Sequence, residues 1–132
     1  MNVNAEQIRE FMADLQPFQP VAYFDKHMDC VRVLIQDVSV TEERLNEYFT
    51  VARANHGLNA GSNVGFTIKG IALLFVQIGL PLKGVHDLVA ILDGIVKAIP
   101  HTAVKRVLEE FSPVLKKNHL SVDFDEPQLL AA

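Results

Sequence analysis

Residues 83–99 carry more apolar surface than a helix on the outside of a protein can expose to water. Eight large aliphatic side chains fall within this stretch, at spacings that cover well over half of the circumference of a helix. Such a helix has to be covered on several sides. We therefore expect it to be either the central helix of its own domain or part of a contact with another subunit. The eight residues are Val85, Leu88, Val89, Ile91, Leu92, Ile95, Val96 and Ile99.

The remaining stripe of this helix is narrow and contains two small residues. His86, Ala90, Gly94 and Lys97 follow one another at helical spacing. The small pair Ala90 and Gly94 would let another backbone approach closely. The sequence therefore predicts an interface on this helix, formed by the residues Ala90, Gly94, Ile91 and Ile95.

The rest of the chain predicts an α+β fold built on a small antiparallel sheet. Alternating apolar residues indicate a hairpin over 21–37 and a closing strand over 120–124. Residues 64–68 alternate like a third strand, although the change to helical spacing nearby leaves a helix open as well. We expect this sheet to pack with about five helices, which span 5–15, 41–55, 70–78, 83–99 and 102–117.

Two of these helices begin with capping signals. Asn4 and Gln7 have the spacing of a capping box before 5–15. The helix 41–55 has two competing starts, a capping box of Ser39 with Glu42 or a cap at Thr41. The core stripe of 41–55 would be formed by Leu45, Tyr48, Phe49 and Ala52.

The overall composition is that of one globular domain. The chain has 132 residues and a net charge of −4. We expect one domain over 1–127, with a frayed tail over 128–132. Cys30 is the only cysteine, which fits a reducing compartment, and we find no secretory signal and no stretch long enough to span a bilayer. These features predict a cytoplasmic protein with no membrane partner. The acidic balance argues against a nucleic-acid partner.

The densest group of reactive side chains lies at the predicted hairpin turn. His27, Asp29 and Cys30 could bind a ligand there, and the fold could bring His86 beside them. Alternate residues of a strand face opposite ways, however, and no second cysteine completes a metal set. We predict no metal, no cofactor and no catalytic residue, and the sequence favours a non-enzymatic protein over an enzyme while leaving both open.

Three functions remain open, in descending order of support. The first is a non-enzymatic interaction or regulatory module that self-associates, or binds a protein partner, through helix 83–99. The second is a small-molecule or metal-binding protein, an enzyme among the options, with a pocket near His27, Asp29, Cys30 and His86. The third is a nucleic-acid binder that uses a helix-turn-helix over 71–89. Its second helix would offer few polar groups to a DNA groove, so two packed helices explain this segment better.

Overall fold

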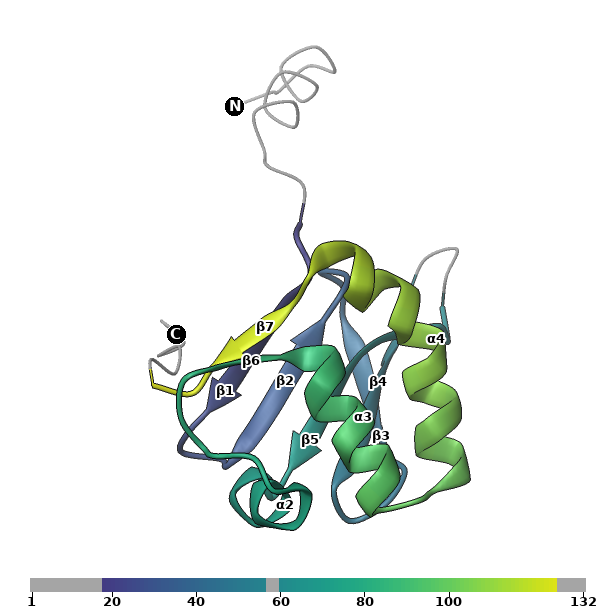
Figure 1. Cartoon of the computed structure of the whole chain (residues 1–132). Coiled ribbons are helices and arrows are strands. Elements are labelled where there is room, and N and C mark those ends of the chain that lie inside the picture. The colour runs from purple at the N-terminus through teal and green to yellow at the C-terminus, as the bar shows by residue number, and fades with distance from the viewer. Residues whose placement is uncertain (1–17, 57–59, 126–132) are drawn as a thin grey trace.

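A five-stranded antiparallel sheet forms the centre of the molecule, in the order β1-β2-β5-β4-β3 (Figure 1). The structure is a computed structural model, and it describes residues 18–56 and 60–125. A separate pair of short strands, β6 and β7, forms a second antiparallel sheet. The strands are β1 (Val21–Asp25), β2 (Cys30–Leu34), β3 (Val40–Arg44), β4 (Phe49–Ala54), β5 (Asn63–Lys69), β6 (Val85–Asp87) and β7 (Ser121–Asp123); the helices are α2 (Ile71–Ile78), α3 (Leu88–Ala98) and α4 (Thr102–Asn118).

Helices α3 and α4 cover one face of the main sheet, and the core lies between them and the strands (Figure 1). Phe66 on the central strand β5 is fully buried, with its ring centroid 5.2 Å from that of Phe49 and 5.0 Å from that of Phe111 on α4. Aromatic rings at these separations add to the stabilisation that comes from burying their surface. The β5–α4 contact therefore holds the helical layer on the sheet.

The two short strands close the side of the sheet next to β1. The Phe124 ring, just after β7, lies 4.9 Å from the Phe24 ring of β1 and 4.8 Å from the Phe75 ring of α2. Leu88, the first residue of α3, donates its backbone N–H to the carbonyl of Leu120. The start of α3 is thus fixed by residues about thirty positions further along the chain.

The predicted helix 41–55 is wrong, because the segment is the hairpin of β3 and β4. Its turn is set by Asn46, whose side-chain oxygen accepts the backbone N–H of Tyr48 at 2.9 Å. Such a side-chain bond gives the backbone a local alternative to helix. Phe49 and Val51 then face the helices, while Thr50 and Ala52 are buried on the other face. A strand that is buried on both faces does not alternate between apolar and polar residues. The spacing of Tyr48, Phe49 and Ala52 therefore resembled the apolar stripe of a helix.

The predicted helix 83–99 is shorter than expected. Residues 85–87 form strand β6, and α3 begins only after Asp87, whose carboxylate accepts the N–H of Val89 at 3.3 Å. The second helix of the proposed helix-turn-helix over 71–89 is therefore absent. The described residues contain three helices rather than about five. The predicted helix 5–15 and the tail 128–132 lie outside the described residues.

Other elements agree with the sequence interpretation, and the fold is a mixed α+β arrangement. The hairpin over 21–37 is formed by β1 and β2, and the ambiguous segment 64–68 is the strand β5. The helices near 70–78 and 102–117 are present as α2 and α4, and β7 lies within 120–124. Among the described residues, no helix is long and apolar enough to cross a membrane.

Candidate functional site

The four polar residues expected near one pocket each have a separate structural environment. His27 is exposed in the β1–β2 turn. Asp29 adopts a left-handed backbone, with φ of 51°, and its carboxylate accepts the N–H of Ala72 at 3.1 Å. Asp29 thereby joins the turn to the first residues of α2, which is a structural role.

Cys30 and His86 are also engaged away from each other. Cys30 is 2% exposed, and burial raises the pKa of its thiol, against the opposing effect of the Arg32 guanidinium. A thiol with a raised pKa is a poor nucleophile at neutral pH. The His86 ring lies edge-on to Phe75 and Phe124, and its Nε2 is 2.8 Å from the carbonyl of Pro81. Within the part of the chain that the structure describes, no three His, Cys, Asp or Glu side chains gather into a metal site.

The four residues of the predicted interface divide between core and surface. Ile91 is fully buried and Ile95 is 5% exposed, so both are covered by their own chain. A Cβ built on Gly94 would lie 3.4 Å from Cδ1 of Ile78, so the group that packs against this small residue is a side chain of α2 in the same molecule and not another backbone. Ala90 is exposed. The apolar surface of α3 is therefore covered largely within one chain.

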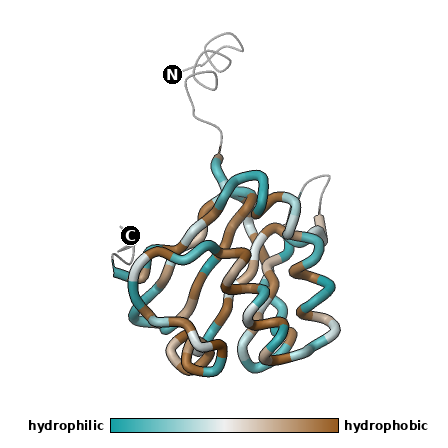
Figure 2. The backbone as a smooth tube through the Cα atoms, in the orientation of Figure 1, coloured by the Kyte–Doolittle hydropathy of each residue, from teal (hydrophilic) through white to brown (hydrophobic). Residues whose placement is uncertain are grey.

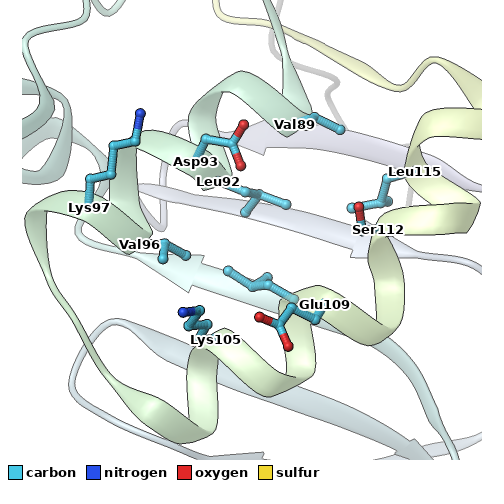
Figure 3. Close-up of a pocket in the computed structure, with 10 residues that line it drawn as sticks. Val89, Leu92, Asp93, Val96, Lys97, Lys105, Glu109, Ser112 and Leu115 are labelled. Carbon is cyan, nitrogen blue, oxygen red and sulfur yellow. The ribbon is translucent and has the colours of Figure 1, made fainter.

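A groove of about 400 Å³ remains open between α3 and α4 (Figure 3). Its floor is apolar, and Leu92, Leu108 and Leu115 lie deepest, each no more than 6% exposed. Val89 and Val96 are half-buried and complete the apolar lining, with the hydroxyl group of Ser112 on the α4 side. The groove is lined by none of the four polar candidates.

Four charged residues border the groove, two from each helix. Asp93 and Lys97 lie one turn apart on α3, and Lys105 and Glu109 lie one turn apart on α4 (Figure 3). Because α4 returns antiparallel to α3 after a short loop, Lys97 and Lys105 lie toward the loop end, and Asp93 and Glu109 lie about one turn further along. The border therefore has a basic pair followed by an acidic pair.

These border charges are not neutralised by other described residues. The ion pairs of the described residues join Arg32 to Asp25 and Arg53 to Glu43, both outside the groove. The groove thus combines an apolar floor with a charged border that is exposed to solvent.

The sequence did not predict the groove, because its lining residues come from two separate helices whose packing the sequence does not show. The charged residues at its border resemble those of any helix face exposed to solvent. The surplus of apolar surface over 83–99 was the signal that pointed toward it. Val89 and Val96 are half-buried members of that surplus and line the groove. Comparison with protein families, with curated proteins and with solved structures gave no match to this chain.

Proposed function

We propose that this chain is a non-enzymatic interaction module that works inside the cell as a homodimer, paired through the groove between α3 and α4. The observation that carries the proposal is the order of charges along the groove. A basic pair, Lys97 and Lys105, is followed by an acidic pair, Asp93 and Glu109. This order is self-complementary under a two-fold rotation.

A two-fold contact places the same surface of both subunits face to face. If the axis passes between the two pairs, the basic pair of one subunit faces the acidic pair of its partner, and this occurs twice. Val96 and Leu108 lie between the pairs and would pack across the axis, where their burial supplies the apolar part of the affinity. The four helices would then form a bundle, a common packing for helical hairpins.

The non-enzymatic part of the proposal is supported by the environments of the polar candidates. Asp29 and His86 are bound to backbone groups, His27 is exposed at a turn, and burial raises the pKa of the Cys30 thiol. A single buried thiol also fits a reducing compartment, which supports the intracellular setting.

Sedimentation equilibrium across a wide concentration range tests this proposal. We expect the wild-type chain to move from monomer to dimer, and a Val96→Asp substitution to shift the transition to higher concentration, because it places an unpaired charge in the apolar centre of the contact. The matched control is Val38→Asp, at an exposed valine outside the groove. A wild-type chain that stays monomeric at every concentration would refute the homodimer.

A further inference from the structure

The helix α2 exposes apolar side chains where a surface helix normally carries polar ones. Ile71, Leu74 and Phe75 face the core and are buried. On the outer face, Leu73 and Val76 lie one turn apart, with 54% and 77% of their surface exposed. No residue from 70 to 82 carries a charge. The outer face of α2 is therefore an apolar surface that none of residues 18–56 and 60–125 covers.

Neighbouring segments enlarge this surface. The β1–β2 turn is tied to α2 through Asp29, and Met28 in that turn is 64% exposed. Leu82 follows α2 and is 39% exposed. Figure 1 shows α2 at one end of the molecule, beside this turn, and Figure 2 shows hydrophobic residues along most of its length. We call Met28, Leu73, Val76 and Leu82 the α2 surface.

Three exposed lysines lie at the border of the α2 surface. Lys26 lies in the β1–β2 turn, Lys69 immediately precedes α2, and Lys83 immediately follows Leu82; all three are exposed. None of the three forms an ion pair with another described residue.

Two carboxylates of the β1–β2 turn lie near this border, and each accepts a backbone N–H. Asp25 accepts the N–H of Met28 and lies 3.8 Å from Arg32, and Asp29 accepts the N–H of Ala72. The α2 surface is therefore an apolar patch bordered by three exposed lysines, on a chain that is acidic overall.

We propose that the α2 surface binds the face of an anionic lipid bilayer. Apolar side chains on a protruding helix can enter the boundary between headgroups and acyl chains, while flanking lysines meet the lipid phosphates. The helix and the turn that carry most of this surface lie at one end of the molecule, where a flat bilayer can approach them. The expectation of no membrane partner rested on the lack of a spanning segment, which surface binding does not need.

Co-sedimentation of the full chain with vesicles tests the proposal. The vesicles contain phosphatidylcholine alone, or phosphatidylcholine mixed with phosphatidylserine. We expect binding to the mixed vesicles that weakens as salt is added, since screening reduces the attraction of the lysines. Substituting Lys26, Lys69 and Lys83 by Gln should lower the partition constant about fivefold per lysine. Each substitution removes the attraction of one positive charge to the anionic membrane surface. The double substitution Leu73→Gln and Val76→Gln should lower it by about tenfold or more.

Matched controls separate this surface from general effects of charge and hydrophobicity. Val38→Gln removes an exposed valine elsewhere, and the pair Lys116→Gln and Lys117→Gln removes two exposed charges from the end of α4. Both controls should bind like the wild type. All substituted side chains are exposed, so the variants should keep the fold, which circular dichroism verifies. Failure of the wild type to bind mixed vesicles at low salt overturns the proposal and leaves the α2 surface to a protein partner. Equal loss in the controls also overturns it.

Discussion

The carboxylate of Asp29 accepts a hydrogen bond from the backbone N–H of Ala72 at 3.1 Å, and so caps a helix that lies forty-three residues away in the chain. The N-cap of α2 is Gly70, which has no side chain to offer. The Asp29 carbonyl also accepts the N–H of Ile71 at 3.2 Å. The first N–H groups of a helix need such acceptors. One turn residue therefore supplies two of them from another element.

Replacing Asp29 by Ala should lower the free energy of unfolding by about 1–2 kcal/mol. The substitution removes the capping carboxylate and places alanine in the left-handed region, where its Cβ is strained. Asp29→Asn keeps an acceptor and tolerates this backbone, so it should retain most of the stability. Urea unfolding of the three proteins measures the difference. Equal losses in both variants would show that the cap contributes nothing.

Two glycines should respond in opposite ways to alanine. A Cβ on Gly65 in β5 would lie 2.5 Å from the carbonyl oxygen of Val33 and 2.9 Å from Cδ2 of Leu34. Since backbone cannot move aside easily, Gly65→Ala should cost about 1–3 kcal/mol. On Gly94 of α3 the Cβ would make an ordinary contact with Ile78, and alanine favours helix by up to about 1 kcal/mol. Gly94→Ala should therefore leave the melting temperature unchanged or raise it, whereas Gly65→Ala lowers it.

The buried thiol of Cys30 predicts a loss of stability at alkaline pH. Burial raises the pKa of Cys30 in the folded protein, so the unfolded chain loses its thiol proton first. The contribution of this group is complete below the unfolded pKa, about 8.5, and is lost as pH rises through the raised folded pKa. Urea unfolding between neutral pH and the alkaline range should show a steeper fall for the wild type than for Cys30→Ala. Tyr23, whose pKa is also raised by burial, adds a later fall common to both proteins. Parallel pH profiles would rule out the thiol as the cause.

The sequence predicted an element correctly where residues close together in the chain determine its structure. The hairpin of β1 and β2 has clear alternation and a polar turn, and α4 has a regular stripe with Val104, Leu108 and Phe111 buried. The boundary of α3 could not be predicted, because residues 85–87 pair with a strand near the end of the chain. Likewise, β4 lies between β5 and β3 and is buried on both faces, which removes the alternation that identifies a strand.

The candidate site was predicted only in part, for a related reason. The excess of apolar residues on 83–99 indicated a surface that needs covering, but Ile91 and Ile95 are covered by the chain itself. What remains open depends on how α4 lies against α3. That packing brings Lys105 and Glu109 beside Asp93 and Lys97, and no spacing in the sequence relates the two pairs.

The homodimer is tested most directly by exchanging charges and mixing the products. One variant carries Asp93→Lys and Glu109→Lys, so its groove has only positive border charges. The second carries Lys97→Glu and Lys105→Glu, so its groove has only negative ones. Each alone should dimerise about tenfold or more weakly than the wild type, because like charges face each other across the two-fold axis. A control with Lys116→Glu and Lys117→Glu changes exposed charges outside the groove and should dimerise normally.

Sedimentation equilibrium of the two variants in an equal mixture is the decisive measurement. A positive groove then meets a negative one, and we predict that the mixture forms a heterodimer at least as stable as the wild-type dimer, with an affinity that falls as salt is added. If the mixture associates no better than either variant alone, the groove between α3 and α4 is not the contact surface, and the central claim is contradicted.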